Sequence, residues 1–379
     1  MSKFDAIRPF YDSEVNNALK SSLNHPILKA MMSFTFPNDE NETWKEKLSN
    51  THSIRDFQCN FIYKSIQKVL EKSSDGLYTS GFEKLKPNTA YLFISNHRDI
   101  ILDTSLLNVA LFDHGLTMTA SAIGDNLIQK DFFHTLSKLN RNFLVQRALL
   151  PRDLLESSKK LSEYISQMLL HENRSVWIAQ REGRTKDGND ATQSGVLKML
   201  SMGSNEKNIM NYFKTLKIVP VSLSYEYDPT DVLKLPQLLA QAKQEIYIKD
   251  KNEDFTTLLS GIMGQKKRIH ISIGDVLESE IDQISSSESN PNKQIQLLTQ
   301  KIDDSILRSY KLWPTNFIAY DLLYKTNQFE AQYSQDEKQL FQRRLEMRID
   351  DNFLQLKDGF LAMYANPVVN KLKYDDSRV

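Results

Sequence analysis

Between residues 88 and 275, short apolar runs alternate with stretches of helical spacing. Short apolar runs bounded by polar turn residues are typical of buried strands, and a recurrence of about three to four positions is typical of helices. We predict strands over the ranges 90–95, 116–122, 142–147, 175–180, 217–225 and 268–273, and helices over 103–112, 126–139, 152–171 and 193–202. This alternation predicts an α/β fold with a mostly parallel mixed sheet that is flanked by helices.

The segments on either side of this alternation read as helical extensions. Apolar residues recur at helical spacing between Phe57 and Leu70, and again in helices predicted near 295–306 and 335–357, beyond a turn-rich break at 285–292. We therefore divide the chain into an N-terminal helical region (1–86), an α/β domain (87–284) and a C-terminal helical region (285–379). Residues 228–265 read as a polar, mixed insertion in the α/β domain.

The N-terminal region contains aromatic and methionine residues that allow two interpretations. They could form a membrane-facing surface, or they could pack as a helical layer against the main domain. We favour packing, because that is the more common role of such residues in a globular chain. The residues concerned are Phe10, Tyr11, Met31, Met32, Phe34 and Phe36.

Composition narrows the class of protein. The 379 residues include 48 Lys and Arg and 48 Asp and Glu, so no global charge favours nucleic acid as a partner. The single cysteine, Cys59, excludes an internal disulfide and a cysteine-based zinc cage. The N-terminus lacks the apolar segment of a signal peptide, and no apolar run is long enough to span a bilayer. We expect a cytosolic protein, or one that is peripheral on the cytosolic face of the membrane.

Polar residues with catalytic potential follow the predicted strand 90–95. His97 stands just beyond the strand, and Asp103 lies at the start of the next predicted helix. Open α/β sheets place their binding and catalytic residues at the carboxyl ends of strands. A histidine whose tautomer is fixed by a carboxylate can act as a general base. His97 and Asp103 are therefore candidate catalytic residues, with Asp99 as a second candidate for the carboxylate.

Two other interpretations of this stretch are open from its residues alone. One is a helix start that carries a surface histidine. The other is a protein-kinase catalytic loop, because His97-Arg98-Asp99 matches the first three letters of that loop. The kinase loop requires an asparagine where this chain has Thr104, and the chain lacks both a G-x-G-x-x-G motif and a D-F-G motif. The kinase interpretation is therefore disfavoured.

Three further stretches combine a predicted strand with notable residues. Strand 175–180 precedes Arg181-Glu182-Gly183-Arg184-Thr185-Lys186, whose cations and hydroxyl could bind a phosphate while Gly183 lets the backbone approach closely. The alternative is a charged surface loop. Strand 142–147 ends in Arg147. Pro220, inside strand 217–225, indicates an edge strand, a bulge or a strand start.

In this order, the four stretches resemble the sequence boxes of the glycerolipid acyltransferase family, which includes glycerol-3-phosphate and lysophosphatidate acyltransferases. Asn96-His97 through Asp103 is similar to the first box, N-H-x4-D, and Phe143 to Arg147 to the second. Glu182-Gly183-Arg184-Thr185 resembles the third, E-G-T-R-like box, and Val219-Pro220-Val221 the fourth. The resemblance covers roughly 88–275. Runs such as N-H-R-D-I and A-Q-R-E-G-R are similar to a bacterial subgroup, and they extend the match to both flanks.

Two departures from the family pattern bear on the site. Five residues rather than four separate His97 from Asp103, which in a regular helix would rotate the carboxylate by about 100°. A bulge or a non-helical start must absorb the extra residue. In the third box Arg184 precedes Thr185, the reverse of the family order, so which of the two reaches a phosphate is open.

The resemblance implies acyl transfer from a thioester, on coenzyme A or acyl carrier protein, to the hydroxyl of lysophosphatidate in phospholipid synthesis. His97 would take the hydroxyl proton while Asp103 orients its ring, and no metal or organic cofactor is required. The residues implied in substrate binding are Asn96, Arg98, Arg147, Glu182, Gly183, Arg184 and Thr185. An apolar route for the lipid chain could come from Phe132, Phe133 and Leu136, and the membrane surface would be a partner.

Two alternatives remain open at this point. The acceptor could be glycerol 3-phosphate or another hydroxylated lipid, and a phosphate-free acceptor would make the Arg184 cluster structural. Alternatively, the chain could be a non-catalytic module that binds lipid or a carrier protein. Such a module would bind lipid without His97 and show no turnover.

Overall fold

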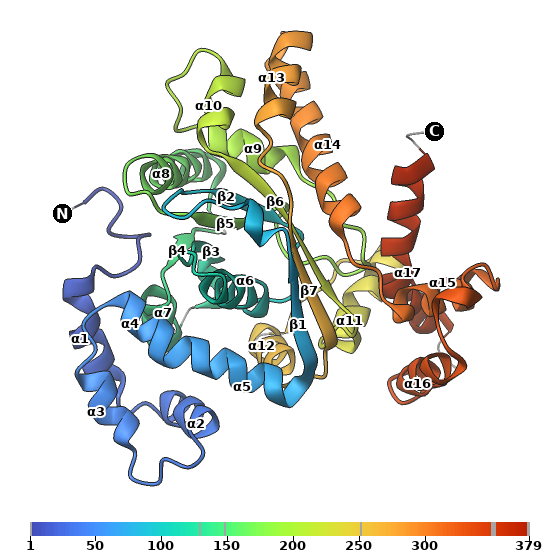
Figure 1. The fold of residues 1–379 in the computed structure, drawn as a ribbon, viewed down its shortest axis with the longest axis horizontal. Helices are drawn as coiled ribbons and strands as arrows, with labels where there is room; N and C mark the ends of the chain where they lie inside the picture. Colours follow the sequence, from blue (N-terminus) through green and yellow to red (C-terminus); the bar gives the residue numbers. More distant parts are fainter. Residues whose placement is uncertain (1, 129, 148, 251, 350–353, 377–379) are drawn as a thin grey trace.

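The computed structural model describes residues 2–128, 130–147, 149–250, 252–349 and 354–376. A single seven-stranded sheet runs through the centre of this described part, with helices on both faces (Figure 1). Its order is β1-β7-β6-β2-β5-β3-β4, and neighbours are parallel except β6 and β7, which are antiparallel. The predicted fold class is therefore confirmed. The strands are β1 (Ser74–Ser80), β2 (Leu92–Ser95), β3 (Ala120–Gly124), β4 (Asn142–Val145), β5 (Val176–Ala179), β6 (Ile218–Tyr225) and β7 (Lys267–Ile273).

Two apolar cores lie on opposite faces of this sheet. Leu92 and Ile94 of β2 pack into one core, and Phe93 between them packs into the other. A strand covered on both faces has no polar side, which explains why β2 reads as a continuous apolar run. Helices on the first face are α8 (Pro151–Leu170), α9 (Ser194–Ser201), α10 (Ile209–Thr215), α13 (Glu278–Ser287) and α14 (Pro291–Ser309). Helices on the second are α5 (Tyr63–Ser73), α6 (Leu102–Asp113) and α12 (Glu253–Met263).

The N-terminal helices build a separate apolar cluster with α7 (Asp131–Leu139). They are α1 (Asp12–Ser22), α2 (Pro26–Thr35), α3 (Thr43–Ser49) and α4 (Ile54–Phe57), followed by a π-helical turn, η1 (Gln58–Ile62). Met32 is fully buried, and Phe10, Met31 and Phe36 pack against the same cluster. Tyr11, by contrast, is 52% exposed. This layer is therefore held together by most of the residues that could have faced a membrane.

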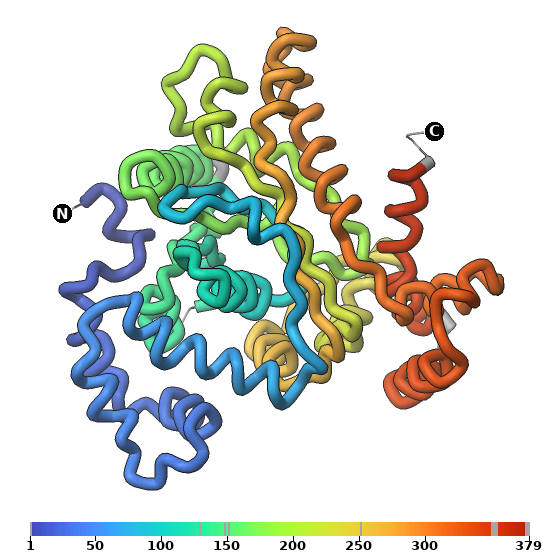
Figure 2. Tube along the Cα trace, in the orientation of Figure 1, coloured from blue at the N-terminus to red at the C-terminus, as the bar shows by residue number. Residues whose placement is uncertain are grey.

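A fourth cluster lies at the other end of the molecule, where the chain traced in Figure 2 ends in α17. It joins α11 (Asp231–Ala242) to the C-terminal helices α15 (Pro314–Tyr324), α16 (Gln335–Glu346) and α17 (Leu354–Asp376). Residues 350–353 of the helix predicted over 335–357 lie outside the described residues. Among the described helices, none is both long and apolar enough to cross a bilayer.

Three local predictions were wrong. The range 1–86 is not wholly helical, because β1 forms the sheet edge beside β7; its sequence is polar and its side chains are at least partly exposed, so it gave no apolar signal. The strand expected at 116–122 is shifted to Ala120–Gly124. The helix expected over 126–139 is a short 3-10 turn, Asp125–Leu127, followed by α7; position 129 lies outside the described residues.

Pro220 lies in an interior strand, so the edge-strand interpretation is wrong. It is aligned with Ile94 of β2 on one side. On the other side its carbonyl accepts from Gly274 N, and the antiparallel ladder with β7 begins one residue later, at Val221. Proline has no N–H to donate, but Pro220 lies beyond the end of β7, where the ladder needs no donor. On that side of β6, Pro220 is therefore equivalent to a residue at a strand start.

Candidate active site

A cavity of about 340 Å³ opens at the carboxyl ends of the parallel strands. The segments that follow β2, β4 and β5 all contribute to it, because parallel strands end at the same edge of the sheet. Its lining residues are His97, Ile100, Asn126, Leu127, Arg147, Arg181, Glu182, Gly183, Arg184, Lys186, Asp187, Gln237, Gln241, Lys249 and Asp254. The cavity therefore combines the predicted base with a group of cations.

His97 and Asp103 form a hydrogen-bonded pair. His97 Nδ1 lies 2.8 Å from Asp103 Oδ2, and the same oxygen accepts from the backbone N–H groups of Arg98 (2.6 Å) and Asp99 (3.0 Å). The hydroxyl of Tyr225, at the end of β6, donates to Asp103 Oδ1 at 2.8 Å. The Asp103 side chain is fully buried, whereas His97 keeps 15% of its side chain exposed. With Nδ1 bound to the carboxylate, Nε2 is the nitrogen left to accept a substrate proton.

The extra residue between His97 and Asp103 lies in non-helical backbone. Helix α6 begins only at Leu102, so Asp103 sits in its first turn and the stretch from Asn96 to Ile101 is irregular. Of the two explanations for the five-residue spacing between His97 and Asp103, the structure therefore shows the non-helical start. Asp99 has a different role, because its Oδ1 accepts from the N–H groups of Ile101 (2.9 Å) and Leu102 (2.8 Å), which caps the helix. The structure thus places Asp103, and not Asp99, against His97.

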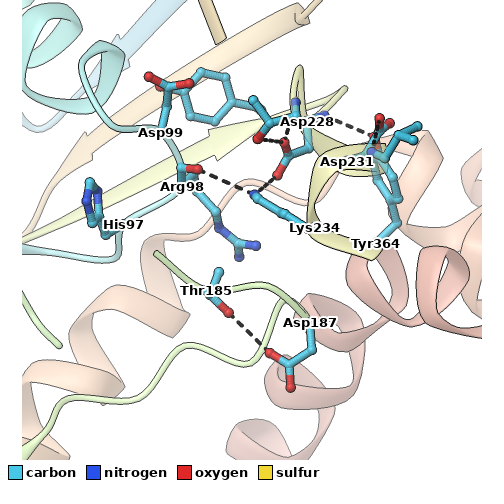
Figure 3. Close-up of polar contacts among 12 residues, drawn as sticks. His97, Arg98, Asp99, Thr185, Asp187, Asp228, Asp231, Lys234 and Tyr364 are labelled. Carbon is cyan, nitrogen blue, oxygen red and sulfur yellow. Dashed lines mark hydrogen bonds and ion pairs between the residues drawn. The ribbon is translucent and has the colours of Figure 1, made fainter. Parts of the chain in front are cut away.

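Three of the predicted substrate-binding residues are buried and hold the loops in place. Asn96 exchanges two hydrogen bonds of 2.8 Å with the backbone of Leu223 in β6. Arg98 pairs with Asp190 at 2.6 Å and is only 8% exposed. Thr185 is 1% exposed; its N–H donates to the His97 carbonyl at 3.1 Å, and its hydroxyl donates to Asp187 (Figure 3). None of the three lines the cavity.

The other four predicted binding residues do line the cavity. Arg147 Nη1 lies 3.2 Å from Glu182 Oε1. Gly183 adopts φ +70°, and nothing lies within 4 Å of where a Cβ would be, so its backbone is open to the cavity. Arg184 Nη1 is buried and has no hydrogen-bond partner among the described residues. Of the two residues in reversed order, Arg184 is therefore the one available to a ligand.

Unsatisfied guanidinium donors make this cavity suitable for an anion. Besides Arg184 Nη1, Arg181 Nε is buried without a partner in the described part of the chain. Buried charged donors are costly to leave unpaired, so their presence in a cavity favours a negatively charged ligand. The nearby cations also affect Lys186, whose ammonium has a pKa lowered to about 7. Burial is the largest cause of this lowering, followed by the charges of Arg184 and Lys234.

Residues of the 228–265 insertion complete the cavity, and the sequence pattern did not reveal them. Gln237 and Gln241 come from α11, Lys249 from the segment that precedes α12, and Asp254 from the first turn of α12. No motif singles them out, because none of them directly follows the end of a strand. Among the described residues, no group of three or more His, Cys, Asp or Glu is placed to hold a metal ion.

The lining supplies a base and a set of cations, and it contains no Ser, Thr or Cys in the part of the chain that is described. Residues 77–224 match the model of the family described as Acyltransferase. This part of the chain belongs to the acyltransferase family. The resemblance found in the four sequence boxes is thereby confirmed for the acyltransferase domain. His97, Arg147 and Arg184 all lie inside the matched segment.

One solved structure that is similar to the chain is the 1-acyl-sn-glycerophosphate (LPA) acyltransferase, PlsC, from Thermotoga maritima. The two share 11% sequence identity with a TM-score of 0.36, over 78% of this chain and 97% of that one. A likeness of this size says nothing about the substrate of the present acyltransferase domain. No curated protein matches the chain.

Proposed function

We propose that this acyltransferase moves an acyl group from a thioester, on coenzyme A or acyl carrier protein, to the hydroxyl of lysophosphatidate. The observation that carries the proposal is the His97–Asp103 pair beside a cavity whose cations include Arg184, and Arg184 Nη1 has no hydrogen-bond partner among the described residues. His97 Nε2 takes the hydroxyl proton as the oxygen attacks the thioester carbonyl, and the imidazolium is stabilised by Asp103. The tetrahedral adduct then collapses with cleavage of the C–S bond, and the leaving thiolate takes the proton from the His97 imidazolium, which restores the neutral base. No acyl-enzyme is formed.

A lipid acceptor is favoured over glycerol 3-phosphate by apolar side chains at and beside the cavity. Ile100 and Leu127 are part of its lining. Ile246 and Ile248 are 90% and 86% exposed, and Ile248 adjoins Lys249, a lining residue. A lyso-lipid needs an apolar approach for its chain, which a soluble acceptor does not. The candidates that the sequence suggested for this route, such as Phe132, are packed in the N-terminal cluster. We also propose that the protein works at the cytosolic face of a membrane, where such an acceptor resides.

The proposal is tested by offering lysophosphatidate and glycerol 3-phosphate in parallel with an acyl thioester and measuring thiol release. We expect release that depends on lysophosphatidate and is faster than with glycerol 3-phosphate. Release with glycerol 3-phosphate alone would move the proposal to that acceptor and leave the role of His97 unchanged. Absence of release with either, together with retained lipid binding, would favour a non-catalytic module.

Arg184→Ala should raise the KM for lysophosphatidate by about 10- to 100-fold, because a hydrogen bond to a charged group contributes roughly 1.5–3 kcal/mol. The KM for the acyl donor should stay within about twofold. Arg343→Ala, which removes an exposed arginine of α16, serves as the matched control and should change neither constant. Equal KM values for lysophosphatidate in Arg184→Ala and the unchanged protein would show that the third box, Glu182 to Thr185, has a structural role and does not bind the acceptor.

Lys186 predicts a pH dependence of acceptor binding. Because its pKa is about 7, the ammonium is charged below that pH and neutral above it. The KM for lysophosphatidate should therefore rise several-fold between pH 6 and pH 8, less any opposing effect of the phosphate's own second ionisation. Lys186→Met should raise KM at pH 6 and remove the rise that Lys186 causes. If the KM for lysophosphatidate depends on pH in the same way in Lys186→Met and in the unchanged protein, Lys186 does not bind the phosphate.

A further inference from the structure

A buried polar chain runs from the catalytic loop to the C-terminal helices (Figure 3). Lys234 of α11 is 1% exposed, and its Nζ donates to the carbonyl oxygen of Arg98 at 3.4 Å. The same ammonium pairs with the carboxylate of Asp228. Burial alone would raise the pKa of Asp228, but the charge and hydrogen bond of Lys234 lower it, so the carboxylate is held ionised. A residue next to His97 is thus anchored by an ion pair that lies outside the family-matched segment.

The far side of this ion pair is held by α16 and α17. The backbone N–H of Asp228 donates to the Tyr364 hydroxyl at 3.0 Å, and that hydroxyl donates to Asp231 Oδ2 at 2.8 Å. Arg344 of α16 donates to the same carboxylate at 2.7 Å and to the Asp228 carbonyl at 3.1 Å. Asp231 is fully buried, and its other oxygen, Oδ1, accepts from the Val232 N–H at 2.8 Å and lies 3.5 Å from Arg348 Nη1, so these contacts among the described residues compensate its charge.

Helix α17 also holds the loop that carries Arg184. Asn366 Nδ2 donates to the carbonyl of Asp187 at 2.6 Å. A Cβ added at Gly188 would lie only 2.3 Å from the carbonyl oxygen of Met363, so the loop backbone rests directly on the helix. The base of the same loop is tied to the catalytic loop by the bond from Thr185 N to the His97 carbonyl. One helix therefore contacts the supports of both His97 and Arg184.

We propose that Lys234 and Tyr364 are positioning residues for the reaction at His97, and that α17 sets the distance between the base and the cationic loop. The proposal rests on the proposed function and deepens it. Neither residue lines the catalytic cavity, so each acts through the backbone of the loops that it holds. A displacement of about 1 Å at a reacting group can lower a rate by about 100-fold, so loss of one such contact is expected to be visible in kcat.

Tyr364→Phe tests this directly, because it removes only the hydroxyl that bridges Asp228 and Asp231. We expect kcat to fall by about tenfold, while the KM values for donor and acceptor stay within about twofold. The matched control is Tyr333→Phe, in the same C-terminal cluster. The Tyr333 hydroxyl donates to a buried carboxylate, Asp321, at 2.9 Å, and among the described residues this bond does not connect it to the catalytic loop. This control should lower the melting temperature to a similar extent and leave kcat unchanged.

Lys234 offers a second pair of variants. Lys234→Met keeps most of the aliphatic stem but leaves Asp228 unpaired, so it should lower both kcat and stability. Lys234→Arg keeps the charge and should restore part of kcat. If Lys234→Met fails to fold, the Tyr364→Phe comparison still decides the proposal.

A readout that needs no turnover separates this proposal from the proposed function. The imidazole resonance of His97 can be assigned as the histidine signal that His97→Ala removes. Tyr364→Phe should shift this resonance, and Tyr333→Phe should not. Wild-type kcat and an unmoved His97 resonance in Tyr364→Phe would overturn the proposal and reduce α17 to a stabilising helix. If the unchanged protein transfers no acyl group at all, the resonance shift still tests the positioning role.

Discussion

His97→Ala should reduce acyl transfer by about 100- to 10,000-fold, the loss that typically follows removal of a general base. The fold should persist, because His97 lines the cavity and its side chain makes one hydrogen bond among the described residues, to Asp103. The measurement is kcat with a saturating acyl thioester, accompanied by a thermal melt. His52→Ala, at an exposed position in the N-terminal region, controls for loss of a histidine and should be silent. Activity within about threefold of the unchanged protein would refute the proposed base.

Asp103→Asn should be nearly as severe, on the order of 1,000-fold in kcat. The carboxylate accepts from three donors through Oδ2 and from the Tyr225 hydroxyl through Oδ1. An amide cannot accept all of them or compensate the charge of an imidazolium. Part of the loss will come from rearrangement of the loop, which the thermal melt will report.

Asp99→Asn is the matched comparison, and it should stay within about threefold in kcat. Burial, and then the charge of Asp103, raise the pKa of Asp99, and its Oδ2 has no hydrogen-bond partner among the described residues. Asparagine preserves the oxygen that caps α6 and removes a buried charge. A larger loss for Asp99→Asn than for Asp103→Asn would move the partner role to Asp99.

The sequence predicted the parts of the fold that carry a strong apolar pattern. Strands β2, β5 and β6 are almost wholly buried, and their largely apolar sequences marked them within two residues of their observed ends, although β6 also contains Ser222 and Ser224. β1 could not be found in this way, because it is a polar edge strand whose place is set by pairing with β7, more than 180 residues away. The polar interpretation of 228–265 missed α11 and α12, which lie within it.

The sequence predicted which segments form the candidate site, but not which of their side chains line the cavity. A motif indicates which residues stand near the strand ends, but it does not tell which side chains face the cavity. The side chains of Asn96, Arg98 and Thr185 do not line the cavity, because they bond to the backbone of Leu223, to Asp190 and to Asp187 respectively. The sequence analysis also missed Lys234 and Tyr364. Their roles depend on contacts between residues more than 130 positions apart in the sequence, which no local pattern indicates.

The most direct test of the account is transfer of a labelled acyl group from its thioester to lysophosphatidate, compared with the phosphate-free monoacylglycerol in the same preparation. The account predicts label in phosphatidate, little in diacylglycerol, and none retained on the denatured protein when the acceptor is withheld. It also predicts that His97→Ala abolishes the transfer. Equal labelling of both lipids, or label that stays covalently on the protein before the acceptor is added, would contradict direct transfer to a phosphate-bearing acceptor.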